Sequence, residues 1–223
     1  MARQIAISDI HGCVKTFRKL VLDVVVLTKD DILFLLGDYV NKGPEAKGVI
    51  DYIFKLRKDG YQVKCLRGNH EQYLLDGLAS RWEEFSFITR GGEETLKSFG
   101  VKSISDIPKI YLDFIQSLPF YIELEEYLLI HAGLDFNLTD PYTDNDSMLN
   151  IREMTVDLKR TGGRKIIHGH VPATINDIEK SILEGASHIS IDSGCVYDKI
   201  PTLSHLVALD LDSKKLYIQK NID

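Results

Sequence analysis

Short apolar runs alternate with amphipathic segments along this chain. The runs are aliphatic or β-branched and are bounded by turn residues, which is the pattern of buried strands. They occupy residues 4–8, 32–36, 62–66, 127–130, 165–167 and 188–191. The segment EAKGVIDYIFKLRKDG at 45–60 predicts a helix that stops at Gly60. Its apolar face consists of Val49, Ile50, Ile53 and Phe54. This alternation of strands and helices predicts α/β layering in the N-terminal half.

Two hairpins are predicted in the C-terminal half. PFYIELEEYLLIH at 119–131 turns near residues 125–126, and LVALDLDSKKLYIQK at 206–220 turns near residues 212–214. We therefore expect a second sheet that is more antiparallel than the first. Residues 70–118 are predicted to be mostly helical, and the acidic stretch 135–150 is predicted to be a loop. Because no repeat or linker interrupts the pattern, we expect an α+β protein with one domain over 1–223.

Composition excludes several classes of protein. The 223 residues are 44% hydrophobic, with a net charge of −6 and a pI near 5.7. This charge balance argues against bulk affinity for nucleic acid or for an anionic membrane. No apolar window approaches the roughly 20 residues of a membrane span, and the N-terminus does not resemble a signal peptide. We therefore expect a cytoplasmic protein. The three cysteines share no metal-type spacing, so a disulfide framework is not expected.

Polar clusters that contain glycine follow the six predicted strands. The clusters are SDIHG (8–12), GD (37–38), RGNHE (67–71), HAG (131–133), HGH (168–170) and DSG (192–194). Because ligands of open α/β sheets bind beyond the carboxyl ends of the strands, we expect these clusters to share one rim. Their side chains are Asp9, His11, Asp38, Asn69, His70, His131, His168, His170 and Asp192.

The residue types in these clusters point to a metal centre. Imidazole and carboxylate together suit Mn, Fe, Zn or Ni, whereas Mg and Ca prefer oxygen ligands alone. Five of the seven histidines lie in the clusters, which favours a metal site over isolated polar residues; His188 and His205 remain without a role.

The motifs resemble those of the calcineurin-like metallophosphoesterase superfamily. Within it, SDIHG, GDYVNKG, LRGNHE, HAGLD and HGHVP, in this order, most resemble the PPP-type serine/threonine protein phosphatases in their small bacterial and phage form. GGEETLKSFG (91–100) and MLNIRE (148–153) are similar to segments of the same group. The resemblance covers nearly the whole chain. It implies a four-layer α/β/β/α sandwich of two mixed sheets flanked by helices.

The resemblance also implies two divalent metal ions, with Mn²⁺ favoured and Fe, Zn or Ni as alternatives. The implied ligands are Asp9, His11 and Asp38 for the first ion, and Asp38, Asn69, His131 and His170 for the second. Asp38 would bridge the two ions, and a hydroxide between them would attack phosphorus in line.

Further roles follow from the same resemblance. Arg67 and Arg152 would bind the phosphate oxygens, and His70 would be the general acid that protonates the leaving oxygen. His168 would support the site without binding metal, although a role as substitute ligand is the alternative. Asp192 would orient a metal-bound histidine or water. Glu71 would be a structural partner of a backbone group or an arginine.

The turn GDYVNKG departs from the family pattern G-D-x-V-D-R-G at Asn41 and Lys42. The family acid pairs with the motif histidine, whereas Asn41 would accept a hydrogen bond from His70 without contributing charge. Lys42 keeps a positive charge near the phosphate but loses the bidentate geometry of arginine. Both residues are therefore expected to weaken the proton donor rather than the metal site.

Three functions remain open at this point. We favour hydrolysis of phosphate monoesters, on phosphoserine or phosphothreonine of a protein or on a small phosphorylated substrate. The alternative is hydrolysis of dinucleoside polyphosphates, because a phosphate leaving group needs less help from a proton donor. The third is a catalytically weak, metal-binding regulatory protein. The sequence specifies no oligomeric state, and it predicts neither a nucleic acid nor a membrane as partner.

Overall fold

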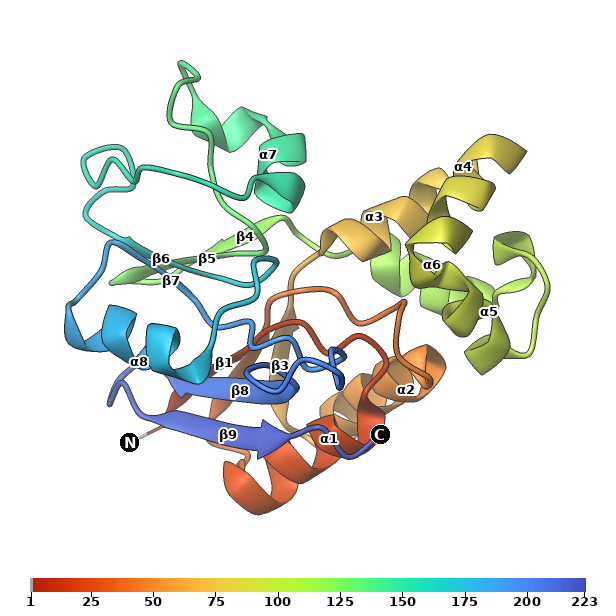
Figure 1. The fold of residues 1–223 in the computed structure, drawn as a ribbon, viewed down its shortest axis with the longest axis horizontal. Coiled ribbons are helices and arrows are strands. Elements are labelled where there is room, and N and C mark those ends of the chain that lie inside the picture. The colour runs from red at the N-terminus through yellow and green to blue at the C-terminus, as the bar shows by residue number, and fades with distance from the viewer. Residues whose placement is uncertain (1) are drawn as a thin grey trace.

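Two mixed β-sheets pack face to face and are flanked by helices in the computed structural model, which describes residues 2–223 (Figure 1). The first sheet has the strand order β3-β2-β1-β8-β9 and the second has the order β4-β5-β6-β7. The strands are β1 (Gln4–Ile7), β2 (Ile32–Leu35), β3 (Gln62–Cys65), β4 (Tyr121–Glu123), β5 (Tyr127–Ile130), β6 (Lys165–His168), β7 (His188–Ser190), β8 (His205–Asp210) and β9 (Leu216–Lys220). The expected four-layer α/β/β/α fold class is thus confirmed.

Alternating side chains of the central strands build the core on both faces of each sheet. In β2, Leu33 packs toward the helices of the first half, whereas Phe34 packs toward the second sheet. In β5, Leu129 faces the first sheet and Leu128 faces the outer layer beside α7. The continuous apolar runs of the sequence thus correspond to strands that are covered on both faces.

The helices lie mostly in the N-terminal half and around the sheets. They are α1 (Val14–Lys19), α2 (Ala46–Lys58), α3 (Asn69–Asp76), α4 (Arg81–Phe87), α5 (Glu93–Phe99), α6 (Lys109–Gln116), α7 (Asn145–Asn150) and α8 (Ile175–Leu183). The predicted helix at 45–60 is α2, which is followed by Gly60 with a φ of 92°. The prediction that 70–118 is mostly helical is confirmed by α3 to α6. None of the helices in the described part of the chain has both the length and the apolar character to cross a bilayer.

Two predictions about secondary structure were wrong. The second sheet is mainly parallel, because β5, β6 and β7 run in the same direction and only β4 is antiparallel. The predicted hairpin β8–β9 exists, but it extends the first sheet, where β8 pairs antiparallel with β1. The stretch 135–150 is not entirely a loop, since it contains α7 after an Asp144 side chain that accepts from Asp146 N–H and so caps the helix.

The topology brings the predicted clusters to one edge of the sandwich. β1, β2 and β3 are parallel to one another, and so are β5, β6 and β7, so each set directs its carboxyl ends to one side. The loops that leave these ends converge between the two sheets (Figure 1). The directions of the strands alone therefore bring these loops together.

The buried carboxylate of Asp31 connects the start of β2 to the residue before β1. It accepts hydrogen bonds from Arg3 N–H at 3.0 Å, Arg3 Nη2 at 2.6 Å, Thr28 N–H at 2.8 Å and Thr28 Oγ1 at 2.9 Å. The bond from the Arg3 guanidinium is the main reason why the pKa of Asp31 lies well below its usual range.

We expect Asp31→Asn to lower the free energy of unfolding by about 1–3 kcal/mol at pH 7, because buried donors lose an ionised acceptor. The folded-state pKa is depressed, so the stabilisation is present above about pH 4 and is lost as the pH falls below the unfolded pKa. The difference in the free energy of unfolding between wild type and variant, measured by urea denaturation, should therefore shrink toward pH 3. Asp59→Asn, which breaks an exposed pair with Lys55, is the control and should change nothing measurable. A gap that persists unchanged at pH 3 would contradict this account.

Candidate metal centre

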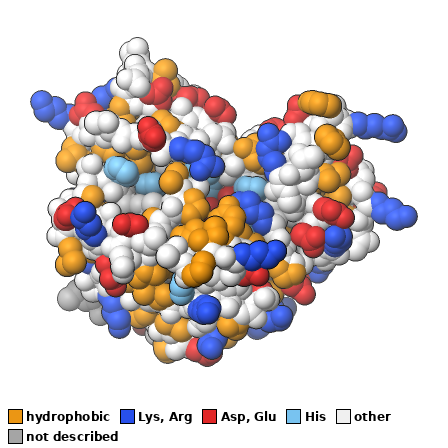
Figure 2. All heavy atoms as spheres, in the orientation of Figure 1, with side chains coloured by type: hydrophobic (Ala, Val, Ile, Leu, Met, Phe, Trp, Pro, Cys, Tyr) orange, Lys and Arg blue, Asp and Glu red, His pale blue; other side chains and the backbone are white. Residues whose placement is uncertain are grey.

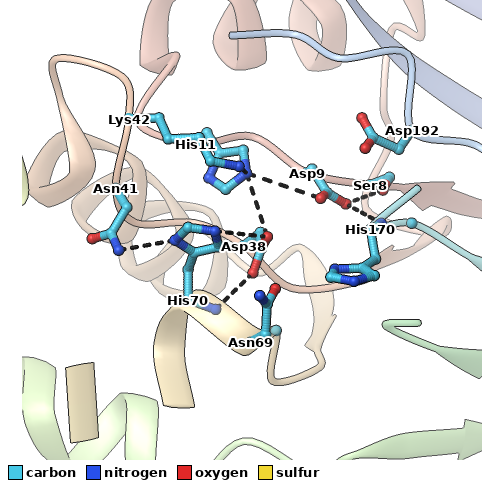
Figure 3. Close-up of polar contacts among 12 residues, drawn as sticks. Ser8, Asp9, His11, Asp38, Asn41, Lys42, Asn69, His70, His170 and Asp192 are labelled. Atoms are coloured by element: carbon cyan, nitrogen blue, oxygen red, sulfur yellow. Dashed lines mark hydrogen bonds and ion pairs between the residues drawn. The ribbon is translucent and has the colours of Figure 1, made fainter. Parts of the chain in front are cut away.

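The candidate ligands come from loops at the carboxyl ends of five parallel strands. Asp9 and His11 follow β1, Asp38 follows β2, and Asn69 begins α3 after β3. His131 follows β5 in the other sheet, and His170 follows β6. Figure 3 shows His11 and His70 on one side of Asp38 and His170 on the other. All six implied ligands are buried, so the side chains that the sequence predicted do converge.

Asp38 lies at the centre of this group. Its Oδ2 is 3.4 Å from His11 Nε2 and 4.0 Å from His70 Nε2, and its Oδ1 is 3.6 Å from His131 Nε2. Potential ligand atoms of His11, Asp38 and His70 lie within 4.8 Å of one another, as do those of Asp9, Asp38 and His131. One carboxylate thus belongs to two groups of residues that could hold a metal ion, as a bridging ligand would.

The backbone is strained where it presents these side chains. His11, Asp38 and His170 have φ values of 44°, 55° and 65°, and the neighbours Asn41 and Lys42 have values of 68° and 66°. Residues other than glycine rarely adopt this left-handed conformation, and such outliers concentrate at functional sites. The strain supports a functional role for the rim.

Glycine is required at two of these turns by close packing. A Cβ on Gly68 would collide with Asp38 Oδ1, and a Cβ on Gly169 would collide with Asp9 Oδ1. The glycines of RGNHE and HGH therefore leave room for the carboxylates of other clusters.

Hydrogen bonds to backbone carbonyls fix which nitrogen of two histidines carries the proton. His11 Nδ1 lies 2.9 Å from Val40 O, and His131 Nδ1 lies 2.9 Å from Leu36 O. Because a carbonyl only accepts, both Nδ1 atoms donate and both Nε2 atoms carry the lone pair, which at His11 accepts from Lys42 Nζ. Burial lowers the pKa of His131, and it lowers that of His11 to about 3 and that of His170 to about 4. Neutral imidazole is the form that binds metal.

Two buried polar atoms of the site, on Asn69 and His170, lack a matching donor, and a cation would supply the missing partner. Asn69 Oδ1 lies 3.0 Å from the lone pair of His131 Nε2, next to the Asp38 carboxylate. His170 Nε2 is buried and has no hydrogen-bond partner within residues 2–223. Burial, with repulsion from Asp9 and Glu71, raises the pKa of Asp38 well above its usual value. The residues present therefore fit divalent metal ions.

His70 is held by a donor and not by an acceptor. Asn41 Nδ2 lies 2.9 Å from His70 Nδ1. The amide is oriented by Thr95, whose hydroxyl donates to Asn41 Oδ1 at 2.8 Å and accepts from Asn41 N–H at 2.8 Å. The prediction that Asn41 accepts from His70 was wrong, because Thr95 already occupies the amide oxygen. His70 Nδ1 is consequently an acceptor, and neutral His70 carries its proton on Nε2, facing Asp38.

A small cavity of about 70 Å³ opens over the candidate metal centre, and Arg152 and Lys42 line it together with Tyr197. Figure 2 shows histidine side chains in the hollow between the two halves of this face of the molecule. Lys42 Nζ donates to His11 Nε2 at 2.9 Å and to the Tyr197 hydroxyl at 3.4 Å. Two cationic side chains over buried carboxylates and imidazoles suit a phosphate group. Tyr197 was not predicted from the sequence as part of the site. The one sequence feature that points to it is its position shortly after the DSG cluster that contains Asp192.

Arg67 does not reach this cavity. Its Nη1 donates to Gln72 Oε1 at 2.9 Å, its Nη2 donates to Gln116 O at 2.6 Å, and its guanidinium lies 4.8 Å from the centre of the Phe120 ring. The structure thus holds Arg67 in contacts with α3 and with the end of α6, and it does not place this arginine in the lining of the cavity over the candidate metal centre.

The structure also places His168 and Asp192, the two residues predicted to support the site. His168 Nδ1 donates to Gly169 O at 3.0 Å, and its Nε2 lies 3.2 Å from Nδ1 of His188, a partner that sequence reasoning left without a role. Asp192 lines the cavity and accepts from Gly194 N–H at 2.7 Å; none of its hydrogen bonds within residues 2–223 involves a histidine.

Glu71 holds the turn that carries Asp38. Its carboxylate accepts from four backbone N–H groups, those of Asp38, Tyr39, Val40 and Gly68, at 2.7–3.2 Å. It is completely buried. Glu71 therefore bonds backbone groups at the loops after both β2 and β3.

Comparisons with known proteins agree with this geometry. The family described as "Calcineurin-like phosphoesterase" matches residues 2–207. A relative from Chromobacterium violaceum, named bis(5'-nucleosyl)-tetraphosphatase, symmetrical, is 33% identical over 129 residues, which are 58% of this chain and 42% of the relative. The chain thus matches less than half of that relative's length.

Two solved structures have the same fold over the whole chain. One is described as a candidate diadenosine tetraphosphatase, with a TM-score of 0.64, 21% identity and 95% of its own chain covered. The other is a protein serine/threonine phosphatase from Saccharomyces cerevisiae, with a TM-score of 0.69, 15% identity and 81% covered. At these identities the likeness concerns the fold alone.

Proposed function

We propose that this chain, which belongs to the calcineurin-like phosphoesterase family, hydrolyses the phosphoanhydride bonds of dinucleoside polyphosphates with two divalent metal ions. The observation that carries the proposal is the hydrogen bond from Asn41 Nδ2 to His70 Nδ1. The name of the relative from Chromobacterium violaceum supports the same class of substrate.

The ligand set would hold the two ions, with Mn²⁺ as the favoured metal. Asp9, His11 and Asp38 would hold one ion, and Asp38, Asn69, His131 and His170 the other. When bound, such ions activate water and stabilise charge on the reacting phosphate. The cavity walls supply the remaining charge, because the Arg152 guanidinium and the Lys42 ammonium face the space where phosphate oxygens would lie.

The hydrogen bond from Asn41 limits what His70 can do as a proton donor. A second proton on His70 would sit on Nδ1 and point at the Asn41 amide hydrogens, so the imidazolium is disfavoured. Neutral His70 can still donate a hydrogen bond from Nε2 to the leaving oxygen. That suffices for a phosphate leaving group, whose pKa is about 6, but not for an alkoxide, whose pKa is nearer about 16. An anhydride is therefore the better substrate.

This order of preference reverses the one that the sequence suggested. Phosphate-monoester hydrolysis on phosphoproteins remains the second candidate, and the MLNIRE segment with Arg152 at the cavity favours it. The Asn41–His70 contact counts against it, because serine and threonine leave as alkoxides.

The substrate test is product analysis. Purified protein with Mn²⁺ should convert diadenosine tetraphosphate to ADP alone, if it cuts symmetrically as the relative's name describes. Chromatography of the nucleotides measures this. Turnover of p-nitrophenyl phosphate without any release of ADP would contradict the proposal.

A larger cavity offers room for a nucleoside beside Arg152. It has a volume of about 650 Å³ and is lined by Phe136, Met154 and the two neighbours of Arg152, Ile151 and Glu153. The metal-centre cavity, at about 70 Å³, is far too small for a base. Phe136 gives this cavity an aromatic side chain, and an aromatic ring suits stacking of a nucleobase.

We expect Phe136→Ala to raise KM for diadenosine tetraphosphate about 10-fold, because base stacking on an aromatic ring contributes about 1–3 kcal/mol. Steady-state kinetics on p-nitrophenyl phosphate serve as the control, and that KM should stay within about twofold. Equal changes in KM for both substrates would show that Phe136 acts on the metal centre and not on the base.

A further inference from the structure

The Asn69 amide can face the metal site with either its oxygen or its nitrogen, and only the oxygen is a metal ligand. In the structure Oδ1 lies 3.0 Å from His131 Nε2, and Nδ2 lies 3.2 Å from the Tyr73 hydroxyl. The reversed amide would donate to His131 Nε2 at 3.0 Å and to both oxygens of Asp38 at 3.3 Å. His131 and Asp38 thus favour the reversed amide, in which the nitrogen faces the metal site. The orientation that presents the oxygen as a ligand therefore needs support from the Tyr73 side.

Tyr73 provides that support through its single hydroxyl proton. The hydroxyl donates to Asn150 Oδ1 at 3.0 Å, across 77 positions of sequence from α3 to α7. Since its proton is used there, the Tyr73 oxygen can only accept from Asn69. The Tyr73 oxygen therefore binds the amide nitrogen of Asn69, which leaves the amide oxygen facing the metal site.

The orientation of Asn150 is fixed in turn by a carboxylate. Asn150 Nδ2 donates to Asp146 Oδ1 at 2.8 Å, one turn earlier on α7. An ionised carboxylate only accepts, so Asn150 must present its nitrogen to Asp146 and its oxygen to Tyr73. Reversing Asn69 would leave Asn150 Oδ1 without its donor, or would require Asn150 to turn its oxygen toward Asp146.

The Tyr73 ring is held in place on two sides. It packs edge to face with His70, with centroids 5.5 Å apart, and the Arg90 guanidinium lies 4.6 Å from its centre. These two contacts restrict the position of the ring that carries the hydroxyl.

We propose that Asp146, Asn150 and Tyr73 form a chain of hydrogen bonds that keeps Asn69 Oδ1 directed at the metal site. We call this chain the polarity relay, because each bond fixes which atom of the next side chain donates. Tyr73 is a positioning residue, since it acts on the metal through Asn69. The relay rests on the metal centre of the proposed function and is independent of the substrate, so a wrong substrate would leave it intact.

The test is Mn²⁺ affinity, measured by isothermal titration calorimetry after chelation of the purified protein. Tyr73→Phe should weaken binding about 10-fold, in the range typical of groups that orient a metal ligand. Asn150→Ala should weaken it further, because a free Tyr73 hydroxyl would then donate to the Asn69 oxygen and hold the reversed amide. Adding Tyr73→Phe to Asn150→Ala should restore affinity toward that of Tyr73→Phe alone.

This rescue separates the relay from a general loss of packing, which would make the double variant the weakest. Tyr111→Phe is the matched control, because its hydroxyl donates to Asp51 Oδ1 at 2.6 Å away from the site, and it should bind Mn²⁺ like wild type. Thermal unfolding of the metal-free variants checks that they fold. Affinity of Tyr73→Phe within about twofold of wild type, or no rescue in the double variant, would overturn the relay. Failure of wild type to bind Mn²⁺ would overturn the metal centre and the relay together.

Discussion

Asp38→Asn is expected to reduce hydrolysis of diadenosine tetraphosphate by about 10³-fold or more, as the loss of a group that stabilises the reacting charge does. The Asp38 carboxylate lies 3.4 Å from His11 Nε2 and 3.6 Å from His131 Nε2, the atoms that carry the lone pairs. An amide nitrogen at this position would donate to those lone pairs and occupy them. Steady-state rates with saturating Mn²⁺ measure the effect.

The same substitution should stabilise the metal-free protein, by about 1 kcal/mol or more, because it removes a buried charge that burial and Asp9 disfavour. Thermal unfolding in the presence of a chelator measures this. Asp51→Asn, which alters an exposed pair with Lys47 on α2, is the matched control and should keep wild-type activity. Activity of Asp38→Asn above about a tenth of wild type would contradict the role of Asp38, and a lower melting temperature would contradict the electrostatic account.

Asn41→Asp is expected to raise the rate on a phosphoserine peptide about 10-fold or more and to change the rate on diadenosine tetraphosphate less than about threefold. A carboxylate would accept from His70 Nδ1–H and stabilise the imidazolium, which is the stronger proton donor. Only the alkoxide leaving group needs that donor. Rates on both substrates for the same protein preparation measure the change in preference.

Thr95→Val is the companion variant, because it removes the hydroxyl that orients the Asn41 amide. The freed amide can then present its oxygen to His70. We therefore expect the rate on the phosphoserine peptide to rise, but by less than in Asn41→Asp. An unchanged phosphoserine rate in Asn41→Asp would mean that the hydrogen bond at His70 Nδ1 does not determine substrate choice.

The positions of the strands and of the ligand clusters could be predicted from the sequence because both depend on local patterns. Short apolar runs bounded by turn residues identified the strands, and the polar groups at their ends identified Asp9, Asp38 and His131. Parallel strands then bring such ends together whatever the exact packing.

Side-chain direction could not be predicted, because it depends on contacts distant in sequence. Asn41 donates to His70 because Thr95, 54 positions away, occupies its oxygen. Arg67 turns away from the cavity because Gln72 and the Gln116 carbonyl bind its guanidinium. The placement of the hairpin β8–β9 on the first sheet likewise depends on the pairing of β8 with β1, 201–205 positions earlier, and not on the hairpin sequence.

The central claim is that this chain prefers a phosphoanhydride to a phosphate monoester. The most direct measurement is a competition in which wild-type protein with Mn²⁺ acts on equal concentrations of diadenosine tetraphosphate and a phosphoserine peptide, so that the product ratio gives the ratio of kcat/KM values. We predict a ratio of at least about 100 in favour of the dinucleotide, the smaller end of what a general acid contributes. Faster release of phosphate from the peptide would contradict the claim.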